Sequence, residues 1–276
     1  PTYDGLAYFK VLVSLGATYF EKQDYYKSID YLIRAEDIYD ARIPAFEGAV
    51  LMNYLGILYY QEGAYQSAWE YFTKALYLMD KDEASMQAAR RTSWLQNVIS
   101  NIGLCHLRLN RPELALKFFH IAYREAKANW NTDGMALAML NKGRAIHSLY
   151  PDSTGLHFYE KAYGLLLVNR SPELLANTVA LLMEAHMDLD QLDGAEPYVV
   201  MALQSLNNNR NLTSTQAVYS ALARYHYLTG AYRPASEYYQ KANLLLDSLT
   251  QLDSKNLMQL EATRQKLSQE RAERKL

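Results

Sequence analysis

Apolar residues recur along the chain at the three- and four-residue spacing of amphipathic helices, and the pattern is clearest in residues 50–78. In this stretch the small residues Gly56 and Ala68 stand where two packed helices must approach each other closely. The large rings of Tyr59 and Phe72 stand beside them and can fill the space around that contact. The stretch is therefore predicted to form two antiparallel helices joined by a short turn.

The same spacing returns along most of the chain. The residues at the position of Gly56 are, in order, Gly16, Gly56, Gly103, Gly143, Met183 and Ala223. Four of the five steps between them are 40 residues, and the step to Gly103 is 47 residues. A fixed period of this length is typical of helical repeat arrays, in which each helix pair buries its apolar face against its neighbours. We predict an all-α array of about six helix-turn-helix units over residues 1–246.

Polar segments that contain Gly, Pro or Asn separate the predicted helices from one another. Within units they are Gln61-Glu62-Gly63, Asn110-Arg111-Pro112, Tyr150-Pro151-Asp152 and Thr229-Gly230. Ser171 followed by Pro172 predicts a helix start, because Ser can cap free backbone amides and Pro suits the first helical turn. The extra residues of the long step fall in 79–94 and predict a longer connection, in which residues 84–91 can be helical.

Residues 247–276 form a separate segment in this interpretation. Leu245 and Leu249 can pack back on the last unit, whereas the composition beyond Gln265 is dominated by Lys, Arg, Glu and Gln. We predict a charged helix that extends from the array. Arg264 stands where a heptad seam would need an apolar residue, so any coiled coil formed here is short.

Composition narrows the functional class. The chain is 50% hydrophobic and 21% charged, which argues against disorder. Its formal charge of −2 provides no overall basic field, so no direct nucleic-acid binding is expected. No run approaches the roughly 18 apolar residues of a membrane helix, and no membrane contact by this segment is expected. The single cysteine, Cys105, allows no internal disulfide and is predicted to be a buried, inert thiol.

Three histidines share the repeat position that Tyr59 occupies in its own unit: His106, His186 and His226. Neighbouring helices lie about 8–10 Å apart. A metal ion needs its ligand nitrogens at about 2.0–2.1 Å. The three rings therefore cannot share one ion, and we expect them to pack between helices.

The other candidate motifs also favour a non-catalytic protein. Asp188, Asp190 and Asp193 resemble a calcium loop in spacing, but Leu192 stands where such a loop needs an oxygen ligand. We interpret this segment as a helix end and a turn. Gly-rich phosphate loops, zinc-protease helix motifs and nucleophile elbows are absent from the sequence. Neither an enzyme nor a cofactor or metal site is expected.

The motif Asn53-Tyr54-Leu55-Gly56-Ile57-Leu58-Tyr59, with Gly63-Ala64-Tyr65, resembles the longer tetratricopeptide repeat (TPR) units of kinesin light chains and bacterial TPR regulators. The resemblance covers roughly residues 9–246. It implies a right-handed superhelix whose concave face, lined by the first helix of each unit, holds a peptide or an extended segment of a partner protein. Carried over position by position, that face comprises Asn53, Ile57, Tyr60, Asn97, Ser100, Asn101, Leu104, Arg108, Leu140, Asn141, Arg144, His147, Asn177, Glu184, Ser220, Arg224 and Tyr227.

Chaperone-binding TPR domains use a carboxylate clamp of Lys, Asn and Arg on three successive first helices. Val13 and Asn53 stand at positions where the clamp has Lys, so that clamp is not expected here. The resemblance still implies a polar groove able to bind backbone amides or an acidic group. Its members are Asn101, Arg108, Asn141, Arg144 and Arg224.

A second resemblance concerns the whole arrangement. A TPR array that runs into a charged helix looks like the sensory part of bacterial membrane-spanning regulators. It implies the sensing or partner-recognition module of a larger signalling or transcriptional regulator, periplasmic in such a protein and cytoplasmic otherwise. The alternative is a free-standing scaffold or adaptor that forms a homodimer through its C-terminal helix or an array end.

Overall fold

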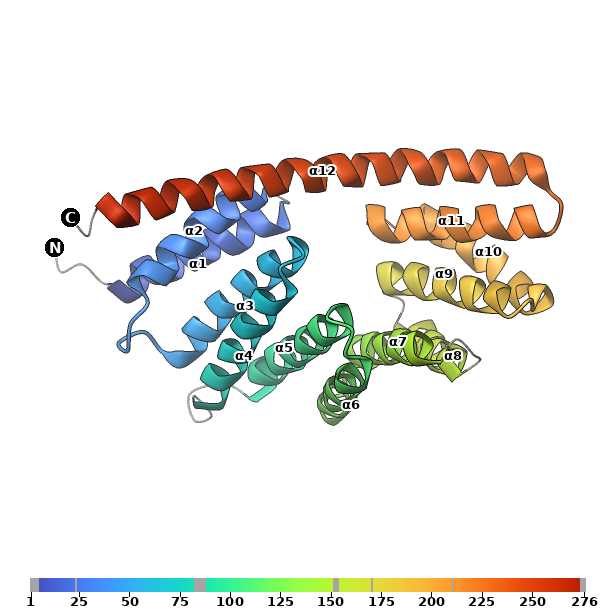
Figure 1. The fold of residues 1–276 in the computed structure, drawn as a ribbon. Helices are drawn as coiled ribbons and strands as arrows, with labels where there is room; N and C mark the ends of the chain where they lie inside the picture. Colours follow the sequence, from blue (N-terminus) through green and yellow to red (C-terminus); the bar gives the residue numbers. More distant parts are fainter. Residues whose placement is uncertain are drawn as a thin grey trace. The chain divides into compact units, whose positions relative to one another are not determined.

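The computed structural model describes residues 5–22, 24–81, 88–150, 154–169, 171–209 and 211–273. Within these ranges the chain is helical and contains no strand (Figure 1). The helices are α1 (Gly5–Glu21), α2 (Tyr25–Ile38), α3 (Ala45–Gln61), α4 (Tyr65–Lys81), α5 (Ala88–Arg108), α6 (Pro112–Ala128), α7 (Thr132–Leu149), α8 (Thr154–Asn169), α9 (Pro172–Asp188), α10 (Leu192–Asn208), α11 (Leu212–Leu228) and α12 (Tyr232–Glu273). The predicted all-α fold of helix-turn-helix units is confirmed.

The chain divides into two compact units. The first comprises Pro1–Leu109 with Leu252–Leu276, and the second comprises Asn110–Gln251. In the first unit α1 packs on α2, and α3 packs on α4, which in turn contacts α5. In the second unit α7 packs on α6 and α8, while α9 packs on α8, α10 and α11. Within each unit, helices that follow one another in sequence therefore pack together, as a repeat array requires.

The predicted marker glycines that the structure describes lie at close contacts between helices. A Cβ atom added to Gly16 would come within 2.6 Å of the Leu32 side chain, and one added to Gly143 within 2.3 Å of the Tyr159 ring. In the unit whose marker is Met183, the large residue lies at the marker position and the small one on the facing helix. Met183 is fully buried, and the smaller Val199 packs against the same cluster. A constant combined volume at this contact explains why the larger residue is tolerated.

The position that the three histidines share is a ring-stacking position. Tyr19 on Tyr31 and Tyr59 on Tyr71 are stacked pairs with centroids 5.5 and 4.9 Å apart. At the same positions in later units, His186 stacks on Tyr198 and His226 on Tyr238, at 5.8 and 5.6 Å. His106, in the first unit, is buried beside the Trp69 ring. Packing of these histidines between helices is thus confirmed.

Four of the turns inside units share one backbone conformation. Gly63, Asn110, Asp190 and Gly230 each lie seven residues after their marker and have φ of 79°, 57°, 55° and 78°. A left-handed residue at this point lets the chain reverse within a few residues. Asp188 ends α9 and Leu192 begins α10, which confirms the helix end and turn proposed for the calcium-like segment.

Two local predictions need adjustment. Helix α9 begins at Pro172 as expected, but the Ser171 side chain makes no capping hydrogen bond. Asn131 and Asn211, by contrast, accept from backbone amides at the starts of α7 and α11. The long connection lies partly outside the described residues. Its described residues belong to the end of α4 and to the start of the 21-residue helix α5.

Helix α12 is continuous over 42 residues and contains the predicted boundary between array and tail. That boundary, at residue 246, remains a prediction. Leu245 and Leu249 are half-buried, whereas the side chain of Arg264 lies outside the described residues. No helix among the described residues is long and apolar enough to cross a membrane.

Candidate functional site

The predicted binding residues lie on the first helix of each repeat. In the first unit they belong to α3 and α5, which contact each other, and we call this surface the α3–α5 face. In the second unit they belong to α7, α9 and α11, where α9 contacts both of the others, and we call this surface the α7–α9–α11 face. Within each face, side chains from successive repeats meet.

On the α3–α5 face, two polar contacts join the helices. The Asn101 side-chain amide donates to the Asn53 side-chain oxygen at 3.4 Å, and Arg108 Nε donates to the Tyr60 hydroxyl at 3.2 Å. The Arg108 guanidinium also lies 5.9 Å from the centre of the Tyr65 ring, a cation–π contact. Polar groups predicted to meet a partner therefore already hold one another in place.

Burial explains the protonation behaviour of this pair. Burial raises the pKa of Tyr60, and the hydrogen bond from Arg108 offsets only part of that rise. The same hydrogen bond raises the pKa of Arg108. The face thus presents a neutral phenol next to a permanent positive charge.

The residues of the α3–α5 face differ in accessibility. Asn53 and Ser100 are buried and support the surface from below. Asn97 and Arg108 are exposed, while the half-buried members are Ile57, Tyr60, Asn101 and Leu104. Contact with a partner therefore falls to the exposed and half-buried side chains.

On the α7–α9–α11 face, Arg144 joins two helices. Its guanidinium donates to the Asn141 side-chain oxygen at 3.2 Å on α7 and to the Asn177 side-chain oxygen at 3.4 Å on α9. Asn141 is almost fully buried, while Arg144 and Asn177 are half-buried. The buried amide fixes the position of a guanidinium that still reaches the surface.

A second arginine on this face bridges α11 and α9. Arg224 pairs with Glu184, which stands at the same position one repeat earlier, and with Asp188, whose carboxylate lies 2.6 Å from Arg224 Nη1. Burial lowers the pKa of Arg224, but the hydrogen bonds to the two carboxylates raise it further, so the net change is a rise. The arginine is held between two negative charges.

Asp188 is the site residue that sequence reasoning missed. It appeared only as part of a helix end, although it stands four residues after Glu184 and therefore on the same side of α9. An acidic pair at this spacing, one repeat before an arginine, is the signal that could have identified it.

The remaining predicted residues have few partners or little exposure. His147 and Tyr227 are exposed near the C-terminal ends of α7 and α11, and the Tyr227 ring meets Tyr232 edge to face. Leu140 is fully buried and is not available to a partner. Ser220 is half-buried and accepts a hydrogen bond from Gln216.

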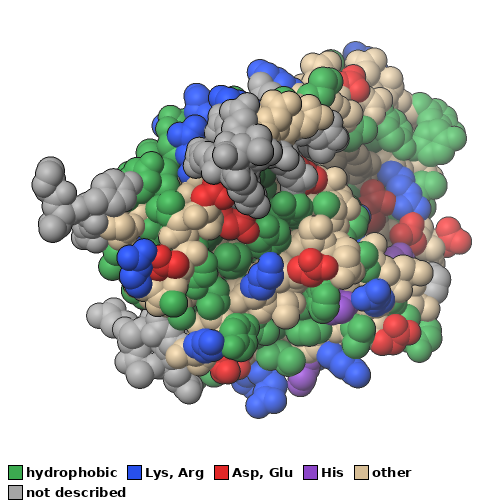
Figure 2. All heavy atoms as spheres, turned by 60° about the vertical axis from the view of Figure 1, so that its left-hand side comes forward, with side chains coloured by type: hydrophobic (Ala, Val, Ile, Leu, Met, Phe, Trp, Pro, Cys, Tyr) green, Lys and Arg blue, Asp and Glu red, His purple; other side chains and the backbone are tan. Residues whose placement is uncertain are grey.

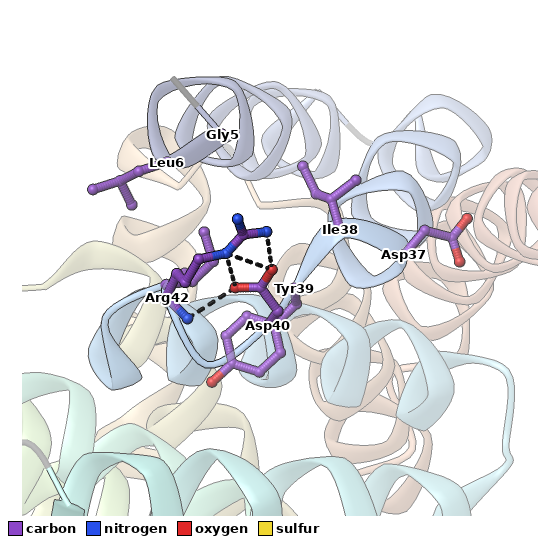
Figure 3. Close-up of a pocket in the computed structure, with 8 residues that line it drawn as sticks. Gly5, Leu6, Asp37, Ile38, Tyr39, Asp40 and Arg42 are labelled. Carbon is purple, nitrogen blue, oxygen red and sulfur yellow. Dashed lines mark hydrogen bonds and ion pairs between the residues drawn. The ribbon is translucent and has the colours of Figure 1, made fainter. Parts of the chain in front are cut away.

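A cavity of about 600 Å³ lies elsewhere in the first unit, between the start of α1 and the connection from α2 to α3. Its lining includes Leu6, Ile38 and Tyr39 (Figure 3). At its rim Arg42 Nε donates to Asp40 at 3.0 Å, and this bond lowers the pKa of the Asp40 carboxyl. Both charged groups at the rim therefore already have a partner.

Two observations concern metal-binding and nucleophilic groups. They contain no group of three or more His, Cys, Asp or Glu side chains that could hold a metal ion. Cys105 is buried, and burial raises the pKa of its thiol to about 12. A neutral, enclosed thiol is a poor nucleophile. On the surface drawn in Figure 2, basic and acidic side chains are interspersed, as expected of a chain with a formal charge of −2.

Comparison with known proteins agrees with this architecture. Residues 8–81 match the family model described as tetratricopeptide repeat. No curated protein matches the sequence at a significant level. The similar solved structures named below are distant in sequence, so they inform on the fold.

Three of these structures are helical-repeat proteins. Aspartyl phosphate phosphatase F from Bacillus subtilis superposes with a TM-score of 0.71 at 18% identity, covering 97% of this chain and 71% of that one. The Rap conjugation gene regulator of plasmid pLS20, solved in complex with the Phr* peptide, gives 0.67 at 16% identity, covering 95% and 74%. A signal transduction ATPase with a tetratricopeptide repeat sensor from Pyrococcus horikoshii gives 0.70 at 16% identity, covering 93% and 40%.

The family model covers the first two helix pairs, and the pairs that follow repeat their marker contacts, ring stacks and turns. Residues 8–81 therefore match the tetratricopeptide repeat family, and the later helix pairs share its fold.

Proposed function

We propose that this chain is a non-catalytic regulatory module that binds a peptide or an extended segment of a partner protein along its first-helix faces. The observation that carries the proposal is the arginine bridge from Arg144 to Asn141 and Asn177. It places the half-buried guanidinium of Arg144 and the half-buried amide of Asn177 on one surface, and such groups can hydrogen-bond the main chain of an extended peptide.

Structural neighbours support the regulatory part of the proposal. The Rap conjugation gene regulator is named as a regulator and was solved with a peptide. The tetratricopeptide repeat fold is generally non-catalytic, although one neighbour is named a phosphatase. A position inside a larger signalling or transcriptional regulator fits the same comparison, because the Pyrococcus protein carries its repeats as a sensor within a longer chain.

The test is selection of displayed random peptides on the purified chain. Selected peptides should bind either the Arg144→Ala or the Asn101→Ala variant more weakly, according to the face that they occupy, because each change removes a donor from one first-helix face. Lys161→Ala, an exposed change on the second helix α8, is the matched control and should leave binding unchanged. Peptides that bind all of these variants as they bind the wild type would place recognition elsewhere and defeat the proposal.

Self-association through α12 is the second candidate. Met258 on this helix is 68% exposed, so the segment 253–276 has an apolar side chain available for a partner copy. Deleting residues 253–276 should then halve the mass of the particle in solution. A truncated chain that keeps the subunit number of the full chain would exclude residues 253–276 of α12 as the contact.

A further inference from the structure

The outer surface of α6 has a basic and apolar character. Its exposed side chains follow one helical stripe and include Leu114, Lys117, Ile121, Arg124 and Lys127. Leu114 and Ile121 are 39% and 41% exposed. The helix carries one exposed acid, Glu113, in its first turn. We call Ile121, Arg124 and Lys127 the basic outer face.

The turn after α6 adds a second unusual feature. Trp130 is 88% exposed and has a φ of 55°. A bulky residue in the left-handed region carries a backbone cost, and its exposed ring returns no packing to the fold. Asn129 and Asn131 on either side bond to Glu125 and Gly134 and hold the turn in place. The ring is therefore presented outward by a fixed loop.

The outer surface of α10 has the opposite character. Its exposed stripe includes Asp193, Glu196, Val200 and Leu203, and the helix contains no Lys or Arg. Val200 and Leu203 are 58% and 39% exposed. We call Asp193, Glu196 and Val200 the acidic outer face. Among the described residues, none of the charged groups of either outer face forms an ion pair.

The other second helices do not separate their charges in this way. Exposed Glu70 and Lys74 alternate on α4, and Glu160 lies beside Lys161 on α8. Charges that only complement the helix dipole explain Lys127 in the last turn of α6 and Asp193 in the first turn of α10. They do not explain the exposed apolar side chains in the same two stripes.

We propose that the basic outer face of one copy of this chain binds the acidic outer face of a second copy, with α6 and α10 antiparallel. In that orientation Lys127 meets Asp193, Arg124 meets Glu196 and Ile121 meets Val200, because both stripes advance by three or four residues at each step. Trp130 then lies beside the turn that precedes the partner copy's α10. The contact uses second helices and leaves both first-helix faces free.

The geometry also sets the strength and form of the assembly. Each helix has 17 residues and is about 25 Å long, so one helix pair buries less than the roughly 800 Å² per partner of a stable interface. The association should therefore be weak, salt-sensitive and dependent on concentration. The two faces differ, so a single contact leaves one free face on each copy, and these free faces can either close the assembly or add further copies.

The experiment is sedimentation velocity of the full chain at rising concentration up to about 1 mM, where even a contact worth about 4 kcal/mol is populated. The wild type should show a rising average mass that falls when salt is added. Arg124→Glu with Lys127→Glu should abolish the rise, and so should Asp193→Lys with Glu196→Lys. In a chain that carries all four changes, the sign of the charge is reversed on both outer faces. The two faces are then complementary again, so the chain should associate.

The control variant is Lys74→Glu with Lys161→Glu, which makes the same change in net charge on α4 and α8 and should associate as the wild type does. Circular dichroism of each variant establishes that it is folded. A wild type that stays monomeric throughout, or folded double variants that associate unchanged, would overturn the proposal. Failure of the folded fourfold variant to regain association would overturn it as well.

Discussion

The ring of Phe72 lies directly against Gly56. A Cβ atom added to Gly56 would stand 2.7 Å from Cδ1 and from Cε1 of that ring, closer than side chains approach in folded proteins. Phe72 itself is 1% exposed and cannot move aside without disturbing the core. The contact decides how closely α3 and α4 approach, and its equivalents recur at Gly16 and Gly143.

Substitution of Gly56 by Ala should therefore destabilise the chain. We expect a loss of about 1–3 kcal/mol in the free energy of unfolding, because the added methyl group forces Phe72 or the helix to shift. Urea denaturation followed by circular dichroism measures it. Gly164→Ala is the control: the position is helical and has nothing within 4 Å, so Ala should stabilise by about 0.5–1 kcal/mol. Equal effects at both glycines would contradict the assigned packing.

Substitution of Gly63 tests the backbone conformation of the turn instead of side-chain packing. It has a φ of 79°, and an added Cβ atom would meet nothing within 4 Å. Gly63→Ala should nevertheless cost about 1–2 kcal/mol in unfolding free energy, because L-residues are strained in the left-handed region. The same urea experiment applies, and an unchanged midpoint would mean that the turn adopts another conformation.

Arg144 and Asn177 should be energetically coupled. Arg144→Ala and Asn177→Ala each remove one side of the same hydrogen bond, so the double variant should lose less stability than the sum of the two single losses. We expect a coupling of about 0.5–1.5 kcal/mol from the double-mutant cycle. The pair Arg144→Ala with Lys161→Ala, for which no shared hydrogen bond is found among the described residues, should be additive. Additivity in the first pair would show that the α7–α9 bridge is not populated.

Cys105 should not react with thiol reagents in the folded chain. Burial raises its pKa from 9.0 to about 12, so the folded protein keeps the thiol protonated at a pH where the unfolded chain forms thiolate. A disulfide reagent at pH 8 should react only after urea is added. The same shift contributes stability that is complete below pH 9 and declines as the pH rises toward 12.

Cys105→Ala removes this contribution, and the alkaline loss of stability should become less steep. It should not vanish, because burial also raises the pKa of Tyr159 from 10.0 to about 12, and that phenol titrates in the same range. Rapid labelling of the native thiol at pH 8 would be incompatible with the buried position of Cys105.

The fold was largely readable from the sequence because its determinants are local and repeated. The marker at Gly56, the ring position at Tyr59 and the turn residue Gly63 lie within eight residues of one another, and each recurs in later units. Helix starts were less accurate, since Ser171 precedes a helix that it does not cap. Whether a side chain caps a backbone amide depends on tertiary contacts, which the local sequence does not specify.

The candidate site was readable only in part. The repeat position placed Arg144, Glu184 and Arg224 on the same face, but it did not reveal which of them meet. Arg224 pairs with Glu184 and Asp188, whereas Arg144 pairs with two asparagines instead. Burial separated Asn141, which supports the surface, from His147, which is exposed.

The sequence by itself determined that the chain is an array of paired helices, because small residues, rings and turn residues at a fixed period leave few other ways to bury the apolar stripes. Only the tertiary structure decided which charged side chains are paired and which are exposed without an ion-pair partner. It showed that the arginines of the first-helix faces are paired across repeats, and that Lys127 and Asp193 remain unpaired on opposite kinds of outer face. The physical reason is that ion pairs and exposure depend on distances between helices, which a one-dimensional pattern does not specify.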